Sequence, residues 1–70
     1  MRKYKELIEI TQEEAFAIIA DPYAADDGLF WQKDGDCYIG IDNTTHAAWT
    51  EEFSTKGACF DWLRGADLND

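Results

Sequence analysis

Long apolar runs are absent from this sequence. No hydrophobic stretch in its 70 residues approaches the roughly 20 residues that a membrane-spanning helix needs. The N-terminal segment MRKYKELIEI is basic, but acidic residues interrupt the apolar stretch that follows, which is not the pattern of a secretory signal peptide. We therefore predict a cytoplasmic protein that does not bind membranes.

Cysteine and histidine are scarce. In a reducing compartment Cys37 and Cys59 should be free thiols rather than a disulfide. Neither belongs to a Cys-x-x-Cys pair, and His46 has no second histidine at a zinc-ligand spacing, so we expect no metal site. Cys37, His46 and Asp42 do not suggest a catalytic triad, because we predict Cys37 in the core and His46 in a turn. We therefore expect no enzymatic activity and no cofactor.

Positive charge is also scarce. Fifteen acidic residues face six basic ones, for a formal net charge of −9. Three of the basic residues lie within the first five positions, so the rest of the chain has only Lys33, Lys56 and Arg64. A body this negative repels nucleic acid and anionic membranes and favours a basic protein surface as its partner. Solubility alone would also explain the charge.

Apolar and aromatic residues are plentiful. Hydrophobic residues make up 46% of the chain, with three Trp, three Tyr and four Phe, which is enough for a folded core. We predict one domain over residues 1–70, with residues 1–3 and 66–70 frayed. A domain this short buries only about 60% of the surface that its unfolded chain exposes, so each large apolar residue matters to stability.

The first part of the chain predicts a strand followed by a helix. Residues 4–10 have the spacing of a strand. Thr11-Gln12-Glu13-Glu14 matches a capping box, which predicts a helix over 12–20. Asp21-Pro22 ends this helix, because proline disfavours helical geometry in the residue before it. A loop over 21–28 follows.

The remainder predicts three strands and a second helix. The strands cover residues 29–33, 36–41 and 47–53, and the helix begins at Ser54 or Thr55, runs to Arg64 and ends at Gly65. The element order is therefore β-α-β-β-β-α. We expect an α+β fold in which a small, mostly antiparallel sheet carries both helices on one face.

The segment KDGDCYI has two interpretations. In a calcium-binding EF-hand loop, Asp34 and Asp36 would fit as ligands. However, Cys37 would then stand where the loop needs glycine, and Asn43 where it needs a bidentate glutamate. The flanking residues are strand-like rather than helical. We therefore predict a β-hairpin with a two-residue turn at Asp34-Gly35.

This hairpin predicts an aromatic sheet face. The turn pairs Trp31 with Tyr38, and we expect both side chains on the face away from the helices. A four-residue loop after the hairpin would add Trp49 to this face, whereas a five-residue loop would turn it inward. The aromatic residues could serve only to stabilise the sheet, or they could form an interface. The opposite, core-forming face would hold Phe30, Cys37, Ile39 and Ile41.

The candidate site combines these aromatic residues with the acids around them. Carboxylates two residues apart on a strand are about 7 Å apart, so they can imitate the spaced charges of a phosphate backbone. We expect a non-enzymatic protein that binds a basic protein surface, with a nucleic-acid-binding enzyme as one candidate partner, and that does not itself bind nucleic acid. The predicted partner-binding residues are Trp31, Asp34, Asp36, Tyr38, Trp49, Glu51 and Glu52.

The segment DNTTHAAWTEEFSTKGACFDWL, together with the size and acidity of the chain, resembles small accessory proteins of phages and mobile elements, anti-CRISPR inhibitors among them. The resemblance implies an inhibitor that acts as a nucleic-acid mimic, and it assigns no role to any residue. The basic N-terminal segment departs from a uniformly acidic mimic. The alternative is a structural or assembly module, monomeric or weakly dimeric, that associates through its aromatic face or an open strand edge.

Overall fold

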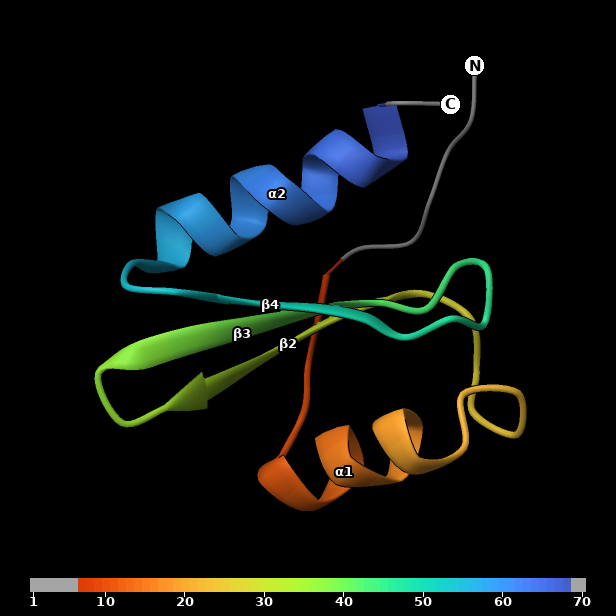
Figure 1. Cartoon of the computed structure of the whole chain (residues 1–70). Helices are drawn as coiled ribbons and strands as arrows, with labels where there is room; N and C mark the ends of the chain where they lie inside the picture. Colours follow the sequence, from red (N-terminus) through yellow and green to blue (C-terminus); the bar gives the residue numbers. More distant parts are fainter. Residues whose placement is uncertain (1–6, 69–70) are drawn as a thin grey trace.

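The sheet of this protein lies between two helices (Figure 1). The computed structural model describes residues 7–68. The element order β-α-β-β-β-α confirms the predicted α+β fold class. The elements are β1 (Ile8–Glu9), α1 (Gln12–Ala20), β2 (Leu29–Asp34), β3 (Cys37–Asp42), β4 (Trp49–Phe53) and α2 (Lys56–Leu68).

The strands form one mixed sheet in the order β1-β2-β3-β4. β1 runs parallel to β2, and the other two pairings are antiparallel, so the sheet is mostly antiparallel as predicted. α1 makes the crossover between the parallel strands. β1 is shorter than the predicted strand over 4–10, of which residues 4–6 lie outside the described part of the chain.

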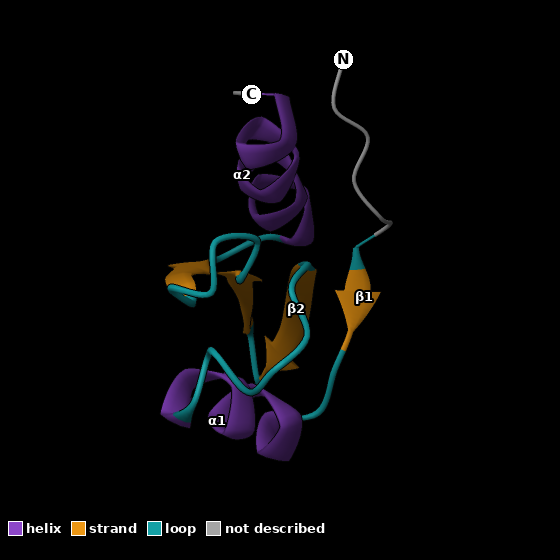
Figure 2. Cartoon of the chain, turned by 90° about the vertical axis from the view of Figure 1, so that its right-hand side faces the viewer, coloured by secondary structure: helices purple, strands orange, loops and turns teal. Residues whose placement is uncertain are grey.

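The two helices cover opposite faces of the sheet, so the prediction that both lie on one face is wrong (Figures 1 and 2). The reason lies in β2, where the first four residues, Leu29 to Gln32, are all buried. A strand that is apolar on both faces needs cover on both. The α1 side packs Ala15, Ile18, Phe30 and Ile41, and the α2 side packs Leu29, Trp31, Cys59 and Leu63.

The predicted capping box begins α1. The Thr11 hydroxyl accepts a hydrogen bond from the Glu14 backbone N–H at 3.1 Å, and the Glu14 carboxylate accepts one from the Thr11 N–H at 2.8 Å. The helix ends at Ala20, before Asp21-Pro22, as predicted. With nine residues, α1 is too short to cover its whole face of the sheet.

The β2–β3 hairpin is confirmed, but its turn lies one residue later than predicted. Asp34 pairs with Cys37, so Gly35 and Asp36 form the turn. Gly35 has φ +62°, at the first central position, where a type II′ turn favours glycine. Trp31 therefore lies opposite Gly40 and not Tyr38. Because the partner shifts by two residues along β3, each side chain keeps its predicted face.

The β3–β4 connection covers residues 43–48, longer than either loop length considered from the sequence. Trp49 pairs with Asp42, and it therefore lies on the same sheet face as Trp31. This is the outcome expected of a loop with an even number of residues. β4 begins at Trp49, two residues later than predicted.

Asn43 joins this connection to the loop that follows α1. Its side chain is fully buried. The amide Nδ2 donates hydrogen bonds to the backbone carbonyls of Pro22 at 3.1 Å and Asp26 at 3.0 Å, and Oδ1 accepts one from the Ala48 N–H at 3.1 Å. A single buried amide thus satisfies three backbone groups from two loops.

α2 packs closely against β3. A Cβ atom on Gly40 would lie 3.1 Å from Cε3 of Trp62 and 3.2 Å from Sγ of Cys59, so the helix approaches where the strand has no side chain. The Thr55 hydroxyl accepts a hydrogen bond from the Ala58 N–H, which confirms Thr55 as a cap.

The predicted end of α2 at Gly65 is wrong, because the helix continues to Leu68. An isolated glycine inside a helix costs about 1 kcal/mol relative to alanine, which weakens the helix without ending it. The predicted fraying of residues 66–70 stays a prediction, and residues 1–3 and 69–70 lie outside the described residues. Neither helix, over the described 7–68, has the length and apolar content to span a membrane.

Candidate functional site

The predicted aromatic face is not open. Trp31 is only 8% exposed, because α2 lies over it, and its ring meets that of Phe60 edge-on with 5.2 Å between centroids. Tyr38 is half-buried beside Trp31. The expectation that these two residues lie on an uncovered face is therefore wrong. They form part of the α2 core.

Trp49 differs from these two residues. It is 63% exposed, although it lies on the same sheet face as Trp31. It is therefore available for contact with a partner, and it is the one member of the predicted aromatic set that is largely exposed.

The four predicted acidic residues, Asp34, Asp36, Glu51 and Glu52, are all exposed, but they do not share one face. Glu52 lies opposite Ile39, which packs on the α1 side, and Asp34 shares that face. Glu51 lies opposite Gly40, on the α2 side. Asp36 lies in the hairpin turn.

Three of these carboxylates surround Cys37. The Glu52 carboxylate, acting as a hydrogen-bond acceptor for the thiol, is the largest cause of the raised pKa of Cys37, with further contributions from desolvation and from the charges of Glu52, Asp34 and Asp36. Cys37 is therefore held as a protonated thiol, the form that is a poor nucleophile and a poor metal ligand. Burial likewise raises the pKa of Cys59. Both cysteines are free, as predicted.

The cations of the described chain lie on the α2 side. Lys33 pairs with Tyr38, and its Nζ lies 6.0 Å from the Tyr38 ring centroid. Lys56 Nζ lies 4.9 Å from the centroid of Trp31. The guanidinium carbon of Arg64 lies 5.4 Å from the ring centroid of Phe60, on α2 itself. Each cation thus lies near an aromatic ring of the α2 layer, at a distance typical of cation–π contacts.

The α1 side is acidic by contrast. Exposed carboxylates lie on α1, beside it and on the sheet face that it partly covers, and we call the surface formed by five of them the acidic face. Among the side chains described by the structure, this side has no Lys or Arg. Asp34 and Glu52 belong to the predicted site, whereas the carboxylates near α1 were missed. The acidic face consists of Glu13, Glu14, Asp26, Asp34 and Glu52.

The separation of the cations from the acidic face could be predicted from the sequence only through the alternation of side chains along the strands. Lys33 shares the parity of Trp31 on β2, and Glu52 shares that of Thr50 on β4. The unpredicted part was the position of α2, which covers the face of Trp31 that the sequence argument left open. The acids of α1 and its following loop lie on the predicted core side of the sheet, but they were not considered as part of the site.

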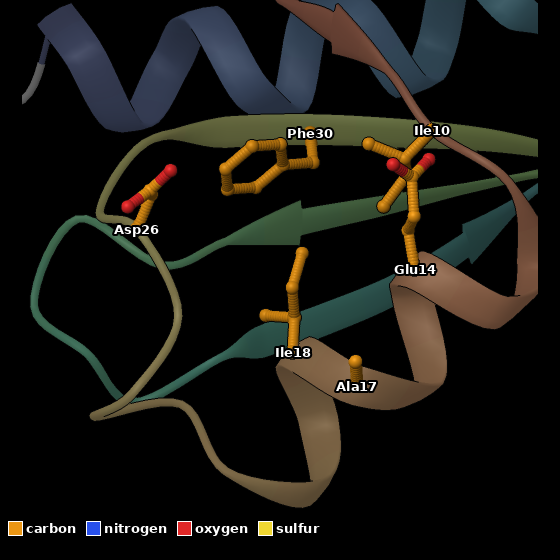
Figure 3. Close-up of a pocket in the computed structure, with 6 residues that line it drawn as sticks. All are labelled: Ile10, Glu14, Ala17, Ile18, Asp26 and Phe30. Atoms are coloured by element: carbon orange, nitrogen blue, oxygen red, sulfur yellow. The ribbon is translucent and has the colours of Figure 1, made fainter.

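An open groove of about 250 Å³ lies within the acidic face, between α1 and β2 (Figure 3). Its apolar wall includes the Phe30 ring. The carboxylates of Glu14 and Asp26 lie at opposite ends of the groove, with the ring between them (Figure 3). We call this feature the α1 groove. Its lining residues are Ile10, Glu14, Ala17, Ile18, Asp26 and Phe30.

Exposed apolar residues also lie on the outer surface of α1. Phe16 is 62% exposed, and Ile19, three residues later, lies on the same part of the helix surface. Tyr23 is exposed in the next turn and stacks on His46, with 6.0 Å between ring centroids. The Nδ1 atom of His46 lies 3.0 Å from the Pro22 carbonyl oxygen, so this histidine has a structural role between two loops.

Within residues 7–68, no group of three or more His, Cys, Asp or Glu side chains has an arrangement that could hold a metal ion. No family model, curated protein or solved structure matches this chain.

Proposed function

We propose that this chain is a non-enzymatic binding protein that engages the basic surface of another protein through its acidic face. The observation that carries the proposal is the segregation of charge. Glu52 on β4 and Asp34 on β2 lie on the α1 side, whereas Lys33, the residue before Asp34, lies on the α2 side.

Solubility alone does not require this segregation. A soluble surface is well served by charges of both signs interspersed over the whole molecule. Here the three described cations lie near aromatic rings on one side, and the other side is left without compensating charge. A uniformly negative surface steers a positively charged partner toward it and repels a negative one.

A protein that naturally binds nucleic acid is a suitable partner, because its basic surface is built to contact spaced phosphates. Carboxylates on β2, on β4 and on the hairpin turn likewise present several separate negative charges. The resemblance to phage and mobile-element accessory proteins favours the same proposal, with inhibition by nucleic-acid mimicry as the mechanism. Its setting would be the cytoplasm, where Cys37 and Cys59 stay reduced.

The test is affinity capture from a host lysate at low and high salt, with identification of the recovered proteins. A nucleic-acid-binding protein recovered at low salt, released at high salt and displaced by DNA is the expected result. The decisive variants are Asp34→Lys with Glu52→Lys on the acidic face, and Glu51→Lys with Asp61→Lys as the matched control of equal charge. Loss of capture with the first pair alone supports the proposal. Equal capture by both pairs contradicts it.

The alternative proposal is a self-associating assembly module. The outer edge of β4 pairs with no other strand of residues 7–68, and Phe16 and Ile19 are exposed on α1. The aromatic sheet face no longer supports this alternative, because α2 covers it. A dimer that persists at high salt in sedimentation experiments and dissociates with Phe16→Gln would favour self-association over binding of a basic partner.

A further inference from the structure

We propose that the α1 groove receives one long basic side chain, a lysine or an arginine, from the surface of a partner protein. The inference takes the class of partner from the proposed function, and it adds where and how one residue of that partner would be held. The groove can be tested alone, with a small probe and without the partner.

The inner wall of the groove suits an aliphatic chain. Ile10, Ile18 and Phe30 provide an apolar wall, and Phe30 and Ile18 belong to the buried core of the α1 side. Lysine and arginine cover apolar surfaces with their methylene groups while their charged ends stay hydrated. A short acidic or hydroxylated side chain would leave this wall without apolar contact.

The ends of the groove suit a cation. Glu14 and Asp26 are exposed and carry charges that no described cation neutralises. One Glu14 oxygen accepts the Thr11 N–H, which leaves the second oxygen free of described partners. The Asp26 side chain also makes no hydrogen bond within residues 7–68, and the hydrogen bond from Asn43 goes to the Asp26 backbone carbonyl. The Phe30 ring between them can add a cation–π contact.

The size of the groove favours a single side chain over a metabolite. Its volume of about 250 Å³ is below the roughly 300 Å³ at the lower end of small-molecule sites. A metal ion is disfavoured, because the two carboxylates lie at opposite ends of an apolar wall (Figure 3).

The carboxylates are also held in place before binding. The capping box fixes Glu14 at the start of α1, and the Asn43 amide fixes the backbone of Asp26. Phe30 is confined by Gly28, where an added Cβ would lie 3.3 Å from Cζ of the ring. A preorganised site loses less conformational entropy when it binds.

The experiment is an NMR titration of the protein with Nα-acetyl-arginine amide and Nα-acetyl-lysine amide. We expect saturable shifts centred on the backbone amides of Glu14, Ile18 and Phe30. Nα-acetyl-norleucine amide has the apolar chain without the charge and should bind several-fold more weakly. Guanidinium chloride has the charge without the chain and should also bind several-fold more weakly.

Two pairs of variants locate the site. Glu14→Gln with Asp26→Asn should abolish saturation, and glutamine at position 14 can still complete the capping box. Glu13→Gln with Asp27→Asn removes the same charge from neighbouring positions outside the groove lining and should leave binding unchanged. Ala17→Leu changes no charge but fills the groove, and it should weaken binding as much as the first pair does.

Equal loss of binding in both pairs, or equal binding of norleucine amide, would overturn the proposal, because each would show that no charged and shaped site exists. Failure of the groove is distinguishable from failure of the proposed function. If the probes do not bind but partner capture still depends on Asp34 and Glu52, the groove proposal is refuted and the proposed function is supported. If the probes bind but partner capture does not depend on those residues, the proposed function is refuted and the groove proposal is supported.

Discussion

The thiol of Cys37 and the carboxylate of Glu52 meet across neighbouring strands, and the carboxylate keeps the thiol protonated. The two residues lie on the α1 side of the sheet, whereas Glu51, the neighbour of Glu52 in the chain, lies on the α2 side. The reactivity of the Cys37 thiol therefore indicates which of the two glutamates lies on its face of the sheet.

We predict slow alkylation of Cys37 at neutral pH. Its pKa is raised, so the thiolate forms only at a pH above the ordinary thiol range, and the rate should rise there. Glu52→Gln should increase the rate of reaction with iodoacetamide at fixed pH, because it removes a negative charge beside the sulfur. Glu51→Gln is the control and should change the rate little, and mass spectrometry measures both. Equal effects of the two variants would contradict the assignment of faces.

We predict that Gly40→Ala destabilises the protein by about 1–3 kcal/mol, the range for overpacking a tight core. The added methyl group would press on Trp62 and Cys59, which hold α2 against the sheet. Urea denaturation followed by tryptophan fluorescence measures the free energy of unfolding. Gly57→Ala is the matched control, because its Cβ meets no atom within 4 Å and should stabilise α2 by up to about 1 kcal/mol. A Gly40→Ala variant with unchanged stability would contradict the close approach of α2 to β3 at this position.

We predict that Asn43→Ala costs on the order of 3 kcal/mol, because it leaves three backbone groups in two loops without their hydrogen-bond partner. A loss of this size is a large fraction of the stability of a small domain. Hydrogen exchange should show lost protection at the Ala48 amide in particular, which donates to Asn43. Thr45→Ala, at an exposed position in the same connection, should change stability by less than about 0.5 kcal/mol.

We predict that Gln32→Leu stabilises the protein by about 1 kcal/mol. Gln32 is only 5% exposed, and its side-chain amide makes no hydrogen bond to any other residue of the described chain. Removing a buried polar group without a partner recovers its desolvation cost, and leucine fits the apolar α1 side. A rise in the thermal midpoint is expected, whereas a fall would show that the amide has a partner.

Local sequence signals predicted much of the fold. Thr11 and Glu14 predicted the start of α1 because a capping box is a contact between residues close in sequence. The Asp-Gly dipeptide predicted the hairpin to within one residue, because the backbone of Gly35 can adopt positive φ at either central position.

Longer-range relationships were not predictable from the same signals. The run Leu29-Phe30-Trp31 is apolar on both strand faces, but it does not say which helix covers which face. Asn43 looks like an ordinary turn residue, since the three groups that it binds belong to segments far apart in the chain. The α1 groove depends on Ile10, Asp26 and Phe30 meeting in space, for which the sequence has no periodic pattern.

Side-chain alternation along β2 separates the two cores, since Phe30 contributes to one and Leu29 and Trp31 to the other. The effects of substitutions on the two sides on the free energy of unfolding should therefore be almost additive. The α2 layer can remain unchanged while residues on the α1 side are substituted. The residues of the proposed binding surface can thus be replaced without rebuilding the layer on the other side of the sheet.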